Sequence, residues 1–301
     1  MWLLFAFSSP VLWAVSTHID KYLVEKYFKN SSTAVLMVFT SLIGLVALPF
    51  IWLHQPQVLA LPRTAIAVMM ASGILYMGAM LLYLQAIQTE EASVVAPLFQ
   101  ASAVWGGALA YFLLGEKLTP AQLAGGAIVL VAGAILSLDK SMRFGRIKIG
   151  LVLRMGACTL ALALSSVIFK YFAVNDEFWS TVFWTFAGEA VLGMAIMAIP
   201  AYARQMFRLL RASPAALLAV NGTNELINLG GGLGARYALM LAPVALVQAI
   251  VSTTTLFVFL FGVLITVFWP SLGREDLSRR NLLQKGAGAV LVAVGVALIN
   301  S

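Results

Sequence analysis

Ten apolar segments of membrane-spanning length limit what this chain can fold into. A helix needs roughly 20 apolar residues to cross the hydrocarbon core of a bilayer. Segments of about that length occupy most of the 301 residues, at 2–19, 32–52, 64–87, 92–114, 119–138, 149–173, 179–201, 214–236, 242–268 and 282–299. Only 10% of the residues are charged, whereas soluble domains carry roughly 25%. We therefore predict an all-α integral membrane protein with ten transmembrane helices.

Similar motifs recur in the same order in the two halves of the chain. Lys21-Tyr22 follows the first segment, and Lys170-Tyr171 follows the sixth. The segment 122–133 is echoed by 284–295 in the same way. Five spans per half is an odd number, so the second half enters the membrane in the opposite sense, as in inverted-repeat transporters. We predict a first five-helix repeat at 1–138, a basic connecting loop at 139–148 and a second five-helix repeat at 149–301.

The chain also resembles the EamA-type transporters of the drug/metabolite transporter superfamily, over nearly its whole length through its length, span count and duplication. The resemblance is carried by Tyr83-Leu-Gln-Ala86, Ala92-Ser-Val-Val-Ala-Pro97-Leu98, Leu114-Gly115-Glu116-Lys117-Leu118-Thr119, Gln122 and Gly126. It implies ten helices in two inverted repeats and a secondary carrier of small metabolites, often an exporter. It also implies a bacterial inner membrane. The second half departs from the pattern, because Gly115-Glu116 has only Gly273-Arg274-Glu275 as its counterpart.

Three amides and one carboxyl group share a helix face within the apolar segment 214–236. Asn221, Asn224, Glu225 and Asn228 stand at positions i, i+3, i+4 and i+7 of a helix. Such groups are costly in hydrocarbon, so this face must point at other helices or at a watery cavity. One interpretation is hydrogen bonding between helices. We favour the other, in which the face lines a substrate pathway.

Four residues are candidates for coupling or gating. A carboxyl group in low-dielectric surroundings can take up a proton near neutral pH, so Glu225 is the first candidate. Glu189 lies well inside the seventh segment, where acids are functional by default, although a bond to a neighbouring helix is an alternative. His18 is a candidate gate, or a histidine that is hydrated or paired with Asp20. Lys170 lies near a helix end, where snorkelling to the interface is the favoured interpretation.

Further polar and aromatic residues lie at positions related by the repeat. Counting 149 residues between the halves places Tyr76 opposite Glu225. Aromatic rings with a few amides and hydroxyls suit a small amphipathic solute, although each residue alone is also compatible with ordinary packing. The predicted substrate-binding set is Asn221, Asn224, Glu225, Asn228, Tyr76, Tyr83, Gln100, Trp105, Gln248 and Ser252.

The remaining composition excludes several classes of protein. One cysteine and two histidines are too few for a conventional metal centre or a catalytic cluster, and no nucleotide-binding motif is present. We predict no enzyme activity, no cofactor and no metal. The net charge of +7 comes from Lys and Arg in the junctions between apolar segments, which set membrane orientation and do not indicate nucleic-acid binding. One side collects 15 of them, against Arg63, Lys117, Lys170 and Arg236 on the other. Because basic loops stay cytoplasmic, both termini are predicted to be extracytoplasmic.

These features predict a secondary transporter that exports or exchanges a small polar or amphipathic metabolite. An amino-acid-like or amine solute is the first choice, with protons as a coupling ion, and a monomer or a homodimer in the lipid bilayer. The alternatives are a non-transporting membrane scaffold or sensor and, third, an intramembrane enzyme.

Overall fold

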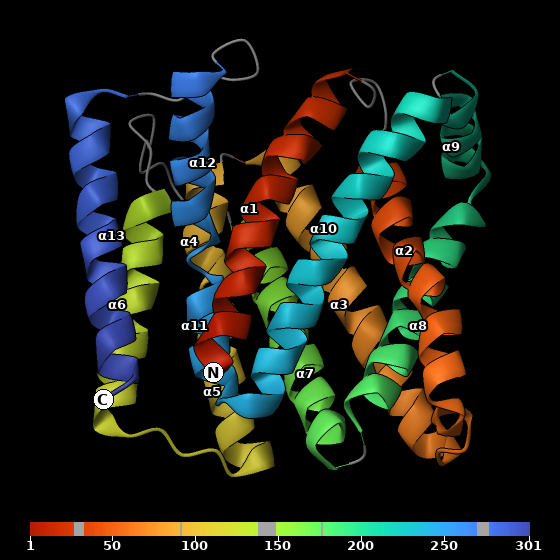
Figure 1. Ribbon diagram of the computed structural model, residues 1–301, viewed down its shortest axis with the longest axis horizontal. Coiled ribbons are helices and arrows are strands. Elements are labelled where there is room, and N and C mark those ends of the chain that lie inside the picture. The colour runs from red at the N-terminus through yellow and green to blue at the C-terminus, as the bar shows by residue number, and fades with distance from the viewer. Residues whose placement is uncertain (27–32, 91, 138–148, 176, 213, 270–276) are drawn as a thin grey trace.

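The computed structural model describes the chain except for residues 27–32, 91, 138–148, 176, 213 and 270–276 (Figure 1). The predicted connecting loop at 139–148 therefore lies outside the described residues. The described part folds into α-helices and one short 3₁₀ turn. They are α1 (Trp2–Lys26), α2 (Thr33–His54), η1 (Pro56–Leu59), α3 (Arg63–Thr89), α4 (Ala92–Phe99), α5 (Ala101–Leu114), α6 (Pro120–Ser137), α7 (Ile149–Asn175), α8 (Phe178–Met197), α9 (Pro200–Ala212), α10 (Pro214–Leu241), α11 (Val244–Val251), α12 (Thr254–Phe268) and α13 (Arg279–Ile299).

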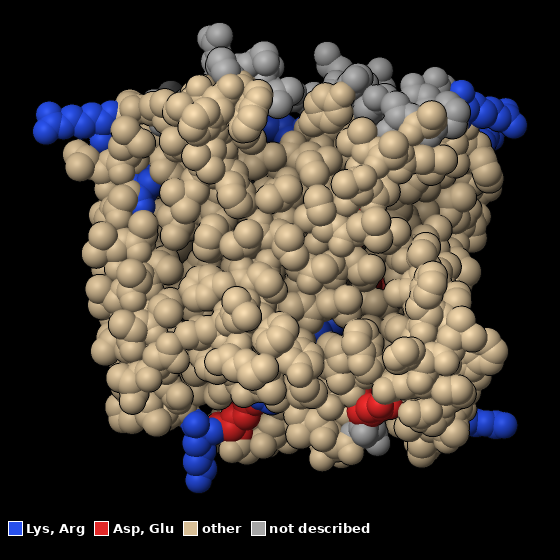
Figure 2. Space-filling view, viewed as in Figure 1, with Lys and Arg blue, Asp and Glu red and all other residues tan. Residues whose placement is uncertain are grey.

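The predicted all-α membrane fold is confirmed. Within the described residues, nine helical segments are long and apolar enough to cross a bilayer. The long helix α10, with 28 residues, corresponds to the predicted eighth span and carries its polar face. On the face seen in Figure 2, Lys and Arg lie mostly at the upper and lower margins of the molecule, on either side of a broad band with few charged atoms. That distribution suits a protein whose apolar sides contact lipid.

The predicted fourth span is interrupted. It consists of α4 and α5, which are separated at Gln100. Pro97 lies inside α4, and proline has no N–H to donate to the helix ladder. The backbone tightens at this point, because the N–H of Gln100 bonds the carbonyl of Pro97 at 3.2 Å, and the N–H of Ala103 bonds that of Gln100 at 3.2 Å. The predicted span at 92–114 therefore remains one candidate membrane crossing, Val94–Leu114, with an irregular turn at Gln100.

The predicted ninth span is also interrupted, between α11 and α12, and here no proline is involved. Three consecutive hydroxyls, those of Ser252, Thr253 and Thr254, each donate at 2.7 Å to the backbone carbonyl three residues earlier. Such side-chain bonds compete with the helix ladder. The two interruptions fall at corresponding places in the two halves.

A short amphipathic helix, α9, was not predicted. The seventh span ends at Met197 instead of residue 201, and Pro200 begins α9 in the position where proline is best tolerated. The arginines of α9 are exposed, while Met206 packs into a core shared with α2 and α10. This pattern is typical of a helix that lies at the membrane surface.

The helices of the two halves pack mainly against each other. α1 lies against α10 and α12, whereas α7 lies against α3 and α5. α2 packs on α8, and α6 packs on α13. Each of these pairs joins a helix from residues 1–138 to one from residues 149–301. α1 rises from the N-terminus in the lower half of the molecule (Figure 1).

Glycines allow the closest of these crossings. A Cβ atom at Gly125 of α6 would lie 2.6 Å from the carbonyl oxygen of Gly295 in α13, and one at Gly295 would lie 2.8 Å from that of Gly125. Gly73 of α3 and Gly188 of α8 meet even more tightly, since a Cβ atom at either would lie 2.0 Å from a backbone oxygen of the opposite helix. Small residues commonly bring membrane helices together in this way.

Candidate functional site

The polar face of α10 is buried between α1 and α2. Asn221, Asn224 and Glu225 are 2%, 1% and 4% exposed. Thr40 of α2 donates a hydrogen bond of 2.8 Å to one carboxylate oxygen of Glu225, and Asn228 approaches the other at 3.4 Å. The helical spacing therefore places the four polar residues of α10 together, and the partners come from the other half of the chain.

Asp20 is a member of this cluster that the sequence analysis did not select. The side-chain amide of Asn224 donates to its carboxylate at 2.7 Å. Asp20 was considered only as a partner of His18. The structure instead places the Nε2 atom of His18 3.0 Å from the carbonyl oxygen of Val258 in α12. His18 therefore contacts α12, whereas Asp20 bonds α10.

The polar cluster is closed in this conformation. None of Asn221, Asn224, Glu225 and Asn228 lines the two cavities described beside α10. In this structure these side chains are buried among neighbouring helices, and their place in a substrate pathway stays a prediction. The side-chain oxygens of Asn221 and Asn224 are nevertheless buried without a hydrogen-bond partner. Most buried polar atoms in proteins are paired, so this cluster has unused capacity to accept hydrogen bonds.

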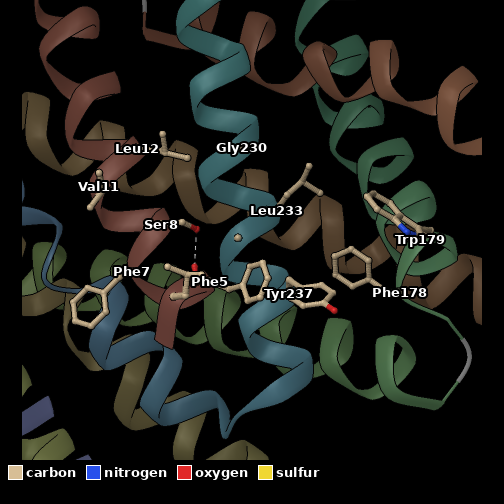
Figure 3. Close-up of a pocket in the computed structure, with 12 residues that line it drawn as sticks. Phe5, Phe7, Ser8, Val11, Leu12, Phe178, Trp179, Gly230, Leu233 and Tyr237 are labelled. Carbon is tan, nitrogen blue, oxygen red and sulfur yellow. Dashed lines mark hydrogen bonds between the residues drawn. The ribbon is translucent and has the colours of Figure 1, made fainter. Parts of the chain in front are cut away.

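The two cavities are apolar and lie on either side of α10. The larger, of about 760 Å³, lies between α1, α8 and α10, with the rings of Phe5, Tyr237 and Phe178 along one wall (Figure 3). The smaller, of about 450 Å³, lies between α2, α8 and α10. Trp179 and Leu233 line both. Their volumes fall within the range of small-molecule sites.

Glu189 forms an ion pair with Arg236. The predicted eighth span ended at Arg236, at the membrane edge. That boundary was wrong, because α10 continues to Leu241 and the arginine is largely buried. The guanidinium carbon lies 4.7 Å from the ring centre of Phe186 and 5.6 Å from that of Tyr76. Arginine tolerates burial when a carboxylate and aromatic faces replace its water. Of the two interpretations of Glu189, the structure displays the bond to a neighbouring helix.

The two tyrosines of α3 belong to different surroundings. Tyr76 lies within electrostatic reach of Arg236, Glu189 and Glu225, and so stands between the ion pair and the amide cluster. Tyr83 instead stacks on Phe99 of α4, with ring centres 4.9 Å apart. Only Tyr76 is close to the polar face of α10.

The residues at the two helix interruptions converge. The side chains of Gln100 and Ser252 both lie against Gly133 of α6, where a Cβ atom would be 2.7 Å from the Gln100 amide nitrogen and 3.4 Å from the Ser252 hydroxyl. The side-chain amide oxygen of Gln100 is buried without a hydrogen-bond partner. Gln248 donates to Ser166 of α7 at 3.0 Å.

Trp105 is separate from this group. It is 43% exposed, as are neighbouring apolar residues of α5, so the structure places it on the outer surface of the bundle rather than beside Gln100.

Lys170 does not snorkel to the interface. It forms an ion pair with Glu116 at 2.5 Å and donates to the carbonyl of Ala242 at 2.6 Å. The other oxygen of Glu116 accepts the N–H of Val244, the first residue of α11, at 2.9 Å. Gly115 makes the turn possible, because its φ of 69° is in the left-handed region that favours glycine. The Gly-Glu turn of the first half thus holds two elements of the second half together.

Part of the chain matches the sequence model of a known protein family. The sequence model of the EamA-like transporter family matches residues 1–138. Residues 1–138 are therefore similar to the EamA-like transporter family. The resemblance noted in the sequence is confirmed, and the match together with the apolar helices supports an integral membrane protein that acts as a transporter. No curated protein matches the chain.

Solved structures support the fold of the whole chain. Twenty-four of their chains match. One, described only as the crystal structure of a protein, is 17% identical and superposes with a TM-score of 0.66, covering 98% of this chain and 94% of the other. At this identity the likeness shows the fold alone. It extends the helical architecture of the EamA-like half to both halves.

Asp20 and Thr40 are the site residues that sequence reasoning missed. Both lie in the EamA-like half and contact α10 of the second half. Asp20 was missed because the first predicted segment ended at residue 19, whereas the apolar part of α1 that could cross a membrane extends to Leu23. Thr40 carried no signal, because a threonine in an apolar helix usually bonds its own backbone.

Proposed function

We propose that this protein is a secondary transporter that moves a small polar or amphipathic metabolite by alternating access between two inverted repeats, residues 1–138 and 149–301. The observation that best supports this proposal is the buried polar cluster at the junction of the halves. There, Asp20 and Thr40 of one half bond Asn224 and Glu225 of the other. Buried acids and amides inside a membrane protein are expensive, and they commonly mark solute and ion pathways.

The packing of the helices supports the inverted repeat. The contact between α1 and α10 corresponds to the contact between α7 and α3. The contact between α1 and α12 corresponds in the same way to the contact between α7 and α5. Two further contacts map onto themselves when the halves are exchanged. They are the contact between α2 and α8 and the contact between α6 and α13. This is the pattern expected when two copies of one five-span unit face each other about a twofold axis in the membrane plane.

The interrupted helices support movement between the halves. Transporters of this kind commonly bind solute where membrane helices are discontinuous, because freed backbone and side-chain groups are available there. Gln100 and Ser252 mark the interruptions in the two halves, and both lie against α6. The closed polar cluster is then the occluded arrangement of the carrier, in which neither side has access.

The proposed orientation places both termini outside the cytoplasm of a bacterial cell. The two ends of the chain lie at the lower edge of the molecule, and the arginine-bearing helix α9 lies at the upper edge (Figure 1). Basic segments remain on the cytoplasmic side, so α9 indicates the cytoplasmic edge. A reporter fused after Ser301 tests this proposal, and it should be active only in the extracytoplasmic compartment.

Counterflow in liposomes tests the transport proposal. Purified full-length protein is reconstituted with unlabelled solute inside, and entry of the labelled solute is followed for a panel of amino acids, amines and other small metabolites. A carrier gives a transient accumulation that Glu225→Gln reduces by at least about tenfold, a change equivalent to roughly 1.4 kcal/mol. A scaffold or sensor would give no counterflow with any solute. Glu177→Gln, a change outside the buried cluster, serves as the matched control.

A further inference from the structure

The polar cluster contains two carboxyl groups, one from each half of the chain. Asp20 comes from α1 and Glu225 from α10, and the two are within electrostatic reach of each other. The neutral side chains that bond them include Asn224 and Ser16 at Asp20, and Thr40 and Asn228 at Glu225. Two like charges in a low-dielectric interior repel strongly, so the two acids together favour the uptake of a proton or of a cationic ligand.

Among the described residues, the charged groups on the surrounding helices are engaged elsewhere or exposed. Arg236 of α10 pairs with Glu189, and Lys170 of α7 pairs with Glu116. On α1, His18 contacts a carbonyl of α12, and Lys21 is exposed. The arginines of α9 are exposed as well. Within the described part of the chain, no cationic side chain is therefore placed to neutralise Asp20 or Glu225.

The unpaired atoms beside the two acids are also hydrogen-bond acceptors. The side-chain oxygens of Asn221 and Asn224 are buried and have no donor, and Asn224 is the residue whose nitrogen contacts Asp20. A buried acceptor without a donor has given up its hydrogen bonds to water without replacing them. Carboxylates and amide oxygens together call for a ligand that brings both a positive charge and several N–H donors. A primary ammonium group, with three donors, has this chemistry.

An apolar cavity begins one helical turn from the acids. Ile43 of α2 lies three residues after Thr40, and Leu226 and Leu229 follow Glu225 on α10. All three line the cavity of about 450 Å³. The residues one turn after Thr40 and Glu225, namely Ile43 and Leu229, therefore line this cavity, so the polar cluster and the apolar cavity occur on the same two helices.

We infer that Asp20 and Glu225 form the recognition site for the primary ammonium group of the transported solute, whose apolar body occupies the cavity between α2, α8 and α10. This inference rests on the proposed transport function and names its substrate class. The site needs a contribution from each half, since Asp20 and Thr40 precede the mid-chain junction and Asn224 and Glu225 follow it. A relative movement of the halves would therefore assemble or dismantle it.

A pair of isosteric probes tests the inference without any mutation. Phenethylamine and phenethyl alcohol have the same apolar body and differ in the ammonium group. The thermal unfolding of the detergent-solubilised full-length protein is followed with each at increasing concentration, at constant ionic strength. A ligand of the native state raises the melting temperature in a saturable manner. We expect phenethylamine to do so and phenethyl alcohol to have no effect at the same concentrations.

Variants then locate the binding. Asp20→Asn and Glu225→Gln should each weaken phenethylamine binding at least tenfold, whereas Glu177→Gln should leave it unchanged. Equal stabilisation by amine and alcohol would overturn the inference, and so would stabilisation by sodium ions with none by the amine. Unchanged amine binding in Glu225→Gln would overturn it as well. Should a variant fail to fold, the comparison of the two probes on the unmodified protein decides the matter.

Counterflow separates this inference from the proposed function. If a neutral or anionic solute is transported while phenethylamine neither binds nor is transported, the carrier proposal stands and the ammonium site is wrong. If phenethylamine binds at the two acids but no solute shows counterflow, the ammonium site stands and the carrier proposal is wrong.

Discussion

The Glu189–Arg236 ion pair should contribute to stability in an asymmetric way. Arg236→Met leaves the Glu189 carboxylate buried without a counter-charge, and breaking a buried pair in this manner costs about 3–5 kcal/mol. Glu189→Gln leaves the guanidinium against aromatic rings, with Phe186 at 4.7 Å and Tyr76 at 5.6 Å. Each such contact is worth about 0.5–2 kcal/mol. We therefore expect Glu189→Gln to destabilise by only about 1–3 kcal/mol, the range for one charged hydrogen bond.

The double variant supplies the decisive comparison. Glu189→Gln with Arg236→Met removes both charges, so its cost should fall short of the sum of the single costs by about 2 kcal/mol, as for residues that interact directly. Unfolding free energies are measured for all four proteins by titrating a mild detergent with sodium dodecyl sulfate and following helicity. Additivity to within about 0.5 kcal/mol, or a larger effect of Glu189→Gln than of Arg236→Met, would refute this reasoning.

Three further predictions use the same unfolding assay or the transport assay. Glu116→Gln and Lys170→Met should each destabilise by about 1–3 kcal/mol, and their double variant by less than the sum; full additivity would mean that the Gly-Glu turn does not hold α7. Gly125→Ala should destabilise, because its Cβ would lie 2.6 Å from a backbone oxygen of α13, whereas Gly286→Ala has no neighbour within 4 Å and should gain up to about 1 kcal/mol of helix propensity. A larger loss of stability in Gly286→Ala than in Gly125→Ala would show that α6 and α13 cross less closely than described. Trp105→Ala should leave counterflow unchanged, and a tenfold loss of counterflow would show that Trp105 lines the solute pathway.

The membrane spans could be predicted because hydrophobic length is a local property of the sequence. The interruptions at Gln100 and Ser252 could not, since they arise from a few hydrogen bonds inside segments that remain apolar throughout. α9 was missed for a related reason. Its arginines indicated a loop between spans, although their spacing leaves Met206 free to pack against the bundle.

The candidate site was predictable only on the helix that carries most of it. The spacing of Asn221, Asn224, Glu225 and Asn228 was sufficient to place them on one face. Their partners Asp20 and Thr40 depend on how α1 and α2 pack against α10, and a single sequence does not specify that register. Arg236 was misplaced because a basic residue was taken to end a membrane span, whereas Glu189 of the neighbouring helix allows it to remain inside.

The proposed transport mechanism depends most on whether the buried polar cluster opens to water during function. Replacing the single cysteine, Cys158, by alanine and introducing Asn221→Cys places one thiol in a cluster that is closed in this structure, where Asn221 is 2% exposed. Its reaction with a membrane-impermeant maleimide is measured in inside-out and right-side-out vesicles, with and without a transported solute. The account predicts that the thiol is labelled from at least one side and that the solute changes the labelling rate. A thiol that stays unlabelled from both sides, with solute and without it, would contradict the account.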